Sequence, residues 1–527
     1  MKKRKNQKLK KSFMWFILLA IVYIVVSKDG YHQWDESCFL FEASYDSSSA
    51  SSCFPQHQFR GNILFLTLLV DIFGKSLFSL FMVDLIYALL VVFSGYFVYK
   101  IFEELFEKEK AKLFIVIFMS LPVILYLGHK SIAEVPGLFL STAAIYLFLL
   151  GLRKNNKYSN LFYILSSVLV FFAGVARTDA PIIYAGFLAS FFIFPPKKID
   201  RKILFKNYVI ITVAFIILFL IFVFIIKFNP FERFISIGPK STEENIFSNG
   251  SGSTITFKER MLKRTVNIPY FFMKDVILAG GFFYILYFIG LFSKKYNLLK
   301  FSALWFILCT LPTLLVIGWT ESRYFYVHAI PLAMISYLGF LIIYENFGKI
   351  SKNFQKISYV LLMIILLSST IFPYYMELEL SEYKMTDIVE KLVMDYSAPS
   401  ASIPNIVIIS PDSYSDFSFL SFVYPYYSIL TSEGEYDAEI IKRNINDKYR
   451  VKNLEDLRNI KSKKFYICNK KFRNAFYSEI RNIFGKPDVY VSDGKCALSW
   501  MWSHENVNMN LIFEDDPYLV FEVSVSN

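Results

Sequence analysis

Long apolar runs, separated by short polar or charged segments, recur along the first 375 residues of this 527-residue chain. Val209–Ile226 is one such run, and several approach the roughly 20 residues that an α-helix needs to cross a bilayer. We expect about eleven spanning helices, so that residues 1–375 form a polytopic α-helical membrane domain.

The distribution of Lys and Arg predicts which loops face the cytoplasm. They concentrate in Met1–Lys11 and in short loops such as Arg153–Lys157, which the positive-inside rule places in the cytoplasm. A spanning helix at the short apolar run Gly61–Phe73 would invert every later loop and move the Lys-rich loops outside. We therefore expect Gly61–Phe73 to be an interfacial helix on the outer surface of the plasma membrane. The N-terminus is then cytoplasmic, and residues 376–527 are extracytoplasmic.

Residues 376–527 have a different pattern, in which short β-branched and aromatic runs alternate with helical stretches. This pattern predicts a small soluble α/β domain. The expected strands are Ile406–Ser410, Phe465–Asn469 and Val489–Ser492, and the expected helical stretches are Ala438–Ile445 and Lys471–Ile483.

Composition narrows the class of protein. Hydrophobic residues make up 55% of the chain, and the net charge is +12. Because the cations follow the loops between apolar runs, the charge does not indicate a nucleic-acid partner. No Walker loop, Rossmann fingerprint or G-x-S-x-G elbow occurs in the sequence, which argues against ATP-driven transport and common hydrolase chemistry.

Four of the cysteines fall in segments that we expect outside the membrane. Cys38 and Cys53 are in the first outer loop, and Cys468 and Cys496 are in the C-terminal domain. Two even pairs in an oxidising compartment favour two disulfides over four free thiols.

The first outer loop contains two adjacent carboxylates, Asp35 and Glu36, between the aromatic residues Trp34 and Phe39. Carboxylates just beyond a membrane helix could form an acid/base site or a metal site. They could equally belong to a solvated loop or cap the following helix.

Three further turns on the expected outer side carry charges at membrane depth. Cations there could hold the phosphate of an anionic lipid, and carboxylates could orient a polar substrate. The same side chains could instead anchor the helices at the interface and pair with each other. The candidate site residues in these three turns are His129, Lys130, Glu134, Arg177, Asp179, Arg323 and Tyr324.

Three of these segments resemble motifs of a known family. Trp34-Asp35-Glu36-x-x-Phe39 resembles the Asp-Glu loop of protein O-mannosyltransferases. Ala133–Pro136 resembles the acidic, Pro-containing start of their fourth helix, and Arg323-Tyr324 followed by Ile330-Pro331 resembles their Arg-Tyr…Pro element. Together with the topology, residues 12–345 resemble the GT-C superfamily, in particular the protein O-mannosyltransferase and aminoarabinose transferase group.

The resemblance implies an inverting glycosyltransferase. A mannose-like hexose would move from a dolichyl- or undecaprenyl-phosphate donor to a hydroxyl of a protein, lipid or glycan acceptor. Asp35 would be the general base, and Glu36 would orient the acceptor. Arg323, with Lys130 or Arg177, would hold the departing phosphate. Glu134, Tyr324, Asp179 and His129 would orient the substrates. Such chemistry requires no cofactor, although Asp35 and Glu36 could bind a divalent cation.

Two other classes of function remain open. A transporter or flippase of a lipid-linked sugar would also need intramembrane charge, but we see no internal repeat and no paired broken helices. A cell-envelope scaffold would explain the C-terminal domain but not the charges in the membrane. Charge on one face favours the enzyme.

Overall fold

The structure, a computed structural model, describes part of the chain. The described residues are 39, 43, 60–74, 77–106, 111–128, 130–153, 158–196, 201–225, 277–316, 322–369, 406–410, 429–431, 458, 463–469, 505–515 and 518–526. Several predictions fall outside them: Asp35, Glu36, His129, the cysteines 38, 53 and 496, the strand at 489–492 and the helical stretches at 438–445 and 471–483.

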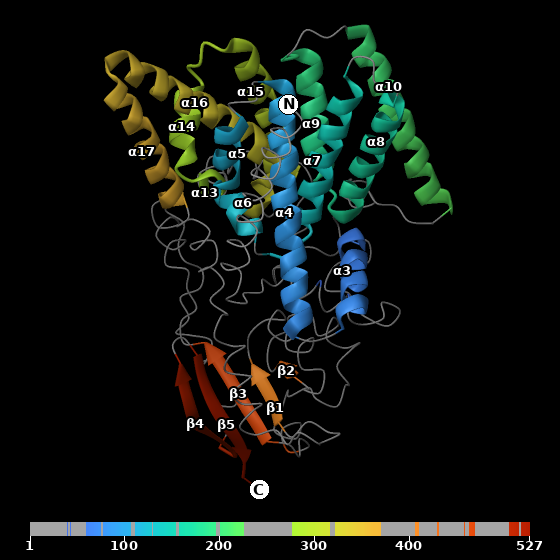
Figure 1. Cartoon of the computed structure of the whole chain (residues 1–527). Helices are drawn as coiled ribbons and strands as arrows, with labels where there is room; N and C mark the ends of the chain where they lie inside the picture. The colour runs from blue at the N-terminus through green and yellow to red at the C-terminus, as the bar shows by residue number, and fades with distance from the viewer. Residues whose placement is uncertain are drawn as a thin grey trace, which may run out of the picture. The chain divides into compact units, whose positions relative to one another are not determined.

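Helices dominate the described residues up to position 369 (Figure 1). They are α3 (Arg60–Phe73), α4 (Leu77–Leu105), α5 (Ala111–Met119), α6 (Pro122–Leu127), α7 (Glu134–Gly151), α8 (Ser159–Ala176), α9 (Pro181–Ile193), α10 (Arg201–Leu220), the π-helical turn η2 (Ile221–Ile225), α13 (Ile277–Gly280), α14 (Phe283–Gly290), α15 (Tyr296–Val316), the 3₁₀ helix η4 (Ser322–His328), α16 (Ala329–Ile350) and α17 (Lys352–Ser369).

Five helical stretches are long and apolar enough to cross a membrane. They are Phe81–Leu105, Glu134–Gly151, Ser159–Ala176, Arg201–Phe224 and Arg323–Ile350. The chain is therefore a helical membrane protein, whereas the expected number of about eleven spans is not confirmed. Two apolar stretches are interrupted: α5 ends at Met119 and α6 begins at Pro122, and Gly281, with φ 53°, separates α13 from α14.

The helix α3 has the form expected of an interfacial helix. Leu64, Leu68 and Ile72, four residues apart on one face, are 61%, 54% and 61% exposed. A helix of 14 residues is about 21 Å long, which is shorter than the roughly 30 Å hydrocarbon core. The position of α3 in the outer membrane surface stays a prediction.

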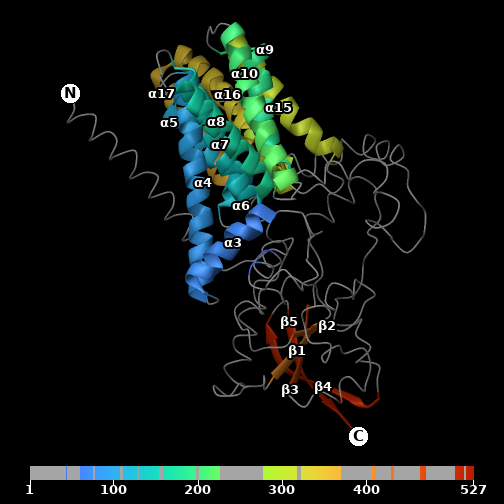
Figure 2. The same ribbon diagram turned by 90° about the vertical axis from the view of Figure 1, so that its right-hand side faces the viewer.

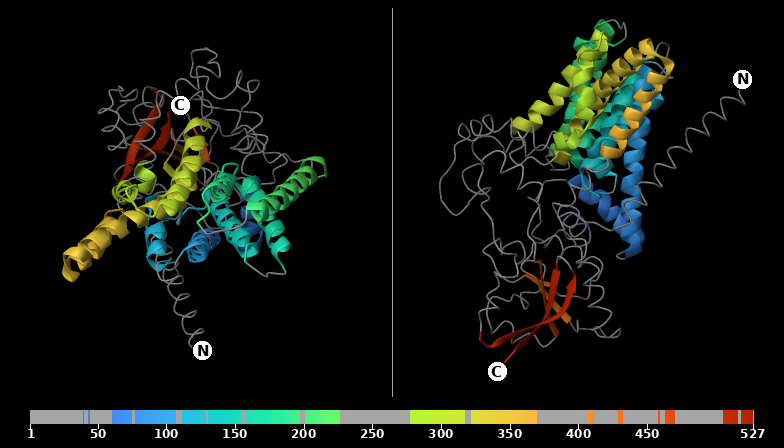
Figure 3. Two further views of the ribbon diagram at one scale, coloured as in Figure 1. Left: turned by 90° about the horizontal axis from the view of Figure 1, so that it is seen from above. Right: turned by 90° about the vertical axis from the view of Figure 1, so that its left-hand side faces the viewer.

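The helix α16 is the centre of the helical unit. Every residue from Ala329 to Phe340 is buried, as expected for a helix that is apolar all round and enclosed by others. The helices α14, α15, α17 and α5 pack against it, while α7 packs against α8 and α9. Seen from above, α10 and α17 lie at opposite ends of this unit (Figure 3).

Glycines let α14 and α16 approach closely. A Cβ on Gly339 would overlap the carbonyl oxygen of Leu286, and a Cβ on Gly290 would overlap the carbonyl oxygen of Ile335. Lipid tails are as apolar as the helix surfaces, so association in a bilayer depends on close van der Waals packing of this kind.

The C-terminal strands belong to a second compact unit, and each unit is described by itself. The strands β1 (Ile406–Ser410), β2 (Ile429–Thr431), β3 (Lys463–Asn469), β4 (Val507–Asp515) and β5 (Tyr518–Val525) form one sheet in the order β2-β1-β3-β5-β4 (Figure 2). β1 is parallel to β2 and β3, and the β4–β5 hairpin adds antiparallel strands beside β3.

This sheet confirms two of the expected strands. Ile406–Ser410 has the predicted bounds, and the strand expected at Phe465–Asn469 begins two residues earlier, at Lys463. Cys468 lies in β3 opposite Leu519. The domain boundary at residue 375 and the soluble character of this part stay predictions.

The glycine contact between α14 and α16 can be tested by Gly339→Ala. We expect the added methyl group to force the helices apart and to lower the free energy of unfolding by about 1–3 kcal/mol, the usual cost of overpacking. Thermal unfolding in detergent measures this. Gly348→Ala on the same helix is the control, because its Cβ would meet only the flexible end of Gln355. Equal melting temperatures for the two variants would contradict the packing argument.

Candidate active site

Four charged side chains are buried together where helices of the first unit end. Glu134 is the first residue of α7, and Arg177 and Asp179 lie between α8 and α9, while Arg323 lies in η4. Their exposed fractions are 0%, 5%, 6% and 4%. Charges at this degree of burial are stable only when they are paired, because desolvation of each ion costs several kcal/mol.

Local sequence explains the turn between α8 and α9. Arg177 leaves the helical conformation, with φ −151° and ψ 122°, and ends α8. Pro181 then occupies the first turn of α9, where its missing N–H costs nothing. Arg177 and Asp179 are therefore presented from a short rigid turn.

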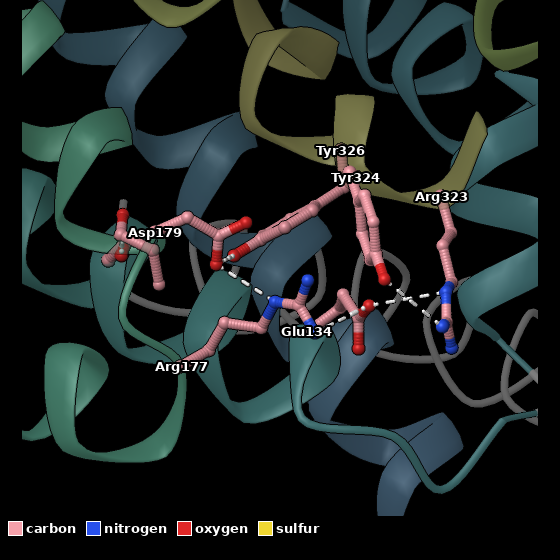
Figure 4. A network of polar contacts seen from close by, with 8 residues as sticks. Glu134, Arg177, Asp179, Arg323, Tyr324 and Tyr326 are labelled. Atoms are coloured by element: carbon pink, nitrogen blue, oxygen red, sulfur yellow. Dashed lines mark hydrogen bonds and ion pairs between the residues drawn. The ribbon is translucent and has the colours of Figure 1, made fainter. Parts of the chain in front are cut away.

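The four charges form a connected network (Figure 4). Nη1 of Arg177 lies 2.9 Å from Oε1 of Glu134, and Nε of Arg177 donates a hydrogen bond of 2.8 Å to Oδ1 of Asp179. Nε of Arg323 lies 3.6 Å from the same Oε1 of Glu134. Glu134 is thus the carboxylate that the two arginines share.

Two tyrosines of η4 complete the network. The ring of Tyr324 lies between the guanidinium groups, with its centroid 4.7 Å from Cζ of Arg177 and 5.1 Å from Cζ of Arg323. Cation–π attraction of this kind stabilises a cation without adding a negative charge. The hydroxyl of Tyr326 donates a hydrogen bond of 3.4 Å to Oδ1 of Asp179.

The carboxylates keep Arg177 charged. Burial alone would lower the pKa of its guanidinium, but Asp179 and Glu134 raise this pKa above its ordinary value. Two arginines and two carboxylates give the network a formal charge of zero.

Small residues bring α7 against the turn. A Cβ on Gly137 would lie 2.8 Å from Cβ of Ala180 and 3.4 Å from Cβ of Arg177. The hydroxyl of Ser141 donates a hydrogen bond of 3.0 Å to the carbonyl oxygen of Ala180. This close approach places Glu134 within reach of Arg177.

His328 connects η4 to two further helices. Its Nδ1 lies 3.2 Å from the hydroxyl of Thr310 on α15, and its Nε2 lies 3.4 Å from the hydroxyl of Tyr284 on α14. A 3₁₀ helix has weak internal hydrogen bonds. These contacts therefore help to fix the turn that carries Arg323.

The structure gives fewer contacts, or none, for the other predicted site residues. Lys130 is buried, with its ammonium group 5.7 Å from the ring centroid of Tyr126. Among the described residues, no three His, Cys, Asp or Glu side chains gather as metal ligands would. Asp35, Glu36 and His129 lie outside those residues, so their roles stay predictions.

The structure adds Tyr326, His328 and Gly137 to the residues that sequence reasoning had selected for this site. Of these, only Tyr326 had a signal in the sequence: it follows Arg323 by three residues, a spacing at which the side chains of a 3₁₀ helix lie on the same side.

The fold and the buried network define a class: a multi-span helical membrane protein with a polar site at its helix ends. Residues 63–226 match the family of dolichyl-phosphate-mannose-protein mannosyltransferases. This segment includes Glu134, Arg177 and Asp179. The comparison with curated protein sequences gives no match.

One solved structure extends the likeness in fold to nearly the whole chain. ArnT from Cupriavidus metallidurans in the apo state has a TM-score of 0.53 at 11% identity, over 98% of each chain. Its complex with undecaprenyl phosphate has a TM-score of 0.48 at 10% identity, over 97% of this chain and 98% of that one. The oligosaccharyltransferase of Archaeoglobus fulgidus, tethered to an acceptor peptide, has a TM-score of 0.48 at 12% identity, over 86% and 69%.

The expected resemblance to the GT-C superfamily is thereby confirmed. The family match covers the helices α4 to α10, and the likeness to apo ArnT shows that the chain shares its fold.

The buried network predicts that replacing Arg177 costs more stability than replacing Arg153, which forms an exposed ion pair. Arg177→Gln should lower the free energy of unfolding by about 3–5 kcal/mol, because it leaves buried carboxylates without their main counter-ion. Arg153→Gln breaks an ion pair with Glu104 in which the arginine side chain is 53% exposed, and should cost less than ~1 kcal/mol. Thermal unfolding of both variants in lipid nanodiscs measures the difference. Similar losses would mean that the network is not a buried ion cluster.

Proposed function

We propose that this protein is an inverting membrane glycosyltransferase. It transfers a mannose-like hexose from a dolichyl- or undecaprenyl-phosphate donor to an acceptor hydroxyl on the extracytoplasmic face. The observation that supports this best is the buried network around Glu134, which lies partly in the segment that matches the mannosyltransferase family. Its two arginines are the groups that would hold a lipid-borne phosphate.

Arg323 is the residue that we assign to the donor phosphate. A guanidinium offers five N–H donors in a planar fork, so it can keep a carboxylate partner while it holds a phosphate oxygen. Tyr324, which accepts a hydrogen bond of 3.5 Å from Nη2 of Arg323, fixes the direction of that fork. Arg177 and Lys130 would add positive charge nearby, as preorganised electrostatic stabilisation requires.

Catalysis would combine this phosphate site with the carboxylates of the first outer loop. Asp35 would take the proton of the acceptor hydroxyl as its oxygen attacks the anomeric carbon, and a single displacement would invert that carbon. Glu36 would orient the acceptor, and Asp179 and His129 would help to orient the polar parts of the substrates. We assign no cofactor, although Asp35 and Glu36 could bind a divalent cation.

Localisation and partners follow from the same proposal. The positions of Lys and Arg between apolar runs favour a cytoplasmic N-terminus, and we assign the protein to the plasma membrane. The donor's lipid tail would lie among the apolar helices, and the acceptor would be a protein, lipid or glycan. Residues 376–527 would face the acceptor side.

The base assignment is tested by Asp35→Asn. Purified protein in lipid would be incubated with a panel of polyprenyl-phosphate sugars, and release of polyprenyl phosphate would be measured. We expect the variant to lose about 10²–10⁴-fold in turnover, the usual contribution of a general base, while it still binds donor. Near-normal turnover would exclude Asp35 as the base. Tight lipid binding without release by wild-type protein would favour a transporter of the lipid-linked sugar.

The phosphate assignment is tested by Arg323→Ala. Charge-assisted hydrogen bonds are worth about 1.5–3 kcal/mol, so KM for the donor should rise by roughly ten- to a hundredfold. KM for the acceptor should change little. Arg153→Ala, which removes a cation from an exposed ion pair, is the matched control. An unchanged KM for the donor in Arg323→Ala would remove this residue from the donor site.

A further inference from the structure

Glu134 lies between the two arginines that we assign to the donor phosphate. Its Oε1 lies 2.9 Å from Nη1 of Arg177 and 3.6 Å from Nε of Arg323, and the side chain is fully buried. Figure 4 shows the carboxylate between the two guanidinium groups. An anion that approaches the arginines therefore meets a negative charge already paired with both.

The proposed reaction changes the charge at this position. The bond between the anomeric carbon and the phosphate oxygen breaks, its electron pair stays on that oxygen, and the acceptor oxygen forms the new bond to carbon. The acceptor's proton goes to the base. The donor phosphodiester carries one negative charge, whereas the product monoester carries about −1.5 to −2 at pH 7. The product would thus bind the arginines more tightly than the donor.

We propose that Glu134 is an internal competitor of the lipid phosphate for Arg177 and Arg323. This inference rests on the proposed function and specifies one role within that site. The carboxylate holds both arginines in place before the donor arrives. It then weakens their hold on the more highly charged product, so that the polyprenyl phosphate is released.

Asp179 provides a matched comparison. It carries the same charge and accepts hydrogen bonds from Arg177 and Tyr326. Among the described contacts it does not reach Arg323. Neutralising either carboxylate changes the network's formal charge from zero to +1, but only neutralisation of Glu134 removes the carboxylate shared by both arginines.

The experiment compares Glu134→Gln with Asp179→Asn. Binding of undecaprenyl phosphate and dolichyl phosphate to full-length protein in nanodiscs would be titrated, and product inhibition would be measured in the transfer assay. Because 1.4 kcal/mol corresponds to a tenfold change, loss of one competing charge should tighten Kd for the monoester roughly tenfold in Glu134→Gln. Asp179→Asn should tighten it by less than about threefold. In Glu134→Gln, the product inhibition constant should fall because the monoester binds more tightly. The value of kcat should also fall, because the product is released more slowly.

Glu134→Asp keeps the proposal testable if the Gln variant fails to fold. Its shorter carboxylate retains the charge but lies farther from Arg323, so the affinity for the monoester should increase to an intermediate degree. Unchanged or weaker monoester binding in the folded Glu134 variants would overturn the proposal. Equal tightening in Asp179→Asn would also overturn it, because net charge alone would then explain the effect. Absence of monoester binding and sugar transfer in wild-type protein would refute the proposed function itself.

Discussion

Mutual neutralisation of buried charges is the constraint on which the site depends. Arg177 and Arg323 can leave water only because Glu134 and Asp179 leave it with them. The four side chains come from α7, from the turn before α9 and from η4, so those elements must meet at one place. The ring of Tyr324 between the guanidinium groups eases the approach of two like charges.

The helices around the network pack as they must in the hydrocarbon of a bilayer, which offers neither hydrogen bonds nor a strong hydrophobic effect. Backbone groups in hydrocarbon must be satisfied within the chain, which favours helices. Helices that gain little from the hydrophobic effect need close contact, and glycines supply it at Gly137 beside Ala180 and at Gly290 and Gly339 between α14 and α16. The same small residues that hold the bundle together therefore also place the charged side chains.

The sequence predicted which charged residues gather in the site better than it predicted which of them form ion pairs. Charges in three separate turns predicted that Glu134, Arg177 and Arg323 share one compartment, and the structure brings them into contact. Spacing could not show that Glu134 serves both arginines, because that depends on tertiary packing. Hydropathy could not locate the breaks at Pro122 and Gly281, because both stretches stay apolar across them. The strand at Ile406–Ser410 could be predicted because it is a short apolar run. The alternation Val507-Asn508-Met509-Asn510-Leu511 in β4 is also typical of a strand, and β4 is missing from the strands expected from the sequence.

The shortness of α9 has a consequence for the surrounding lipid. Its 13 residues extend about 20 Å, whereas the hydrocarbon core is about 30 Å thick. If the end near Phe194 meets one membrane–water boundary, an upright α9 ends about 10 Å short of the other, whereas α7 and α8, with 18 residues each, extend about 27 Å. Such hydrophobic mismatch is relieved by local thinning of the bilayer or by entry of water. A lipid headgroup beside α9 would then lie at the depth of the charged network without leaving its own leaflet.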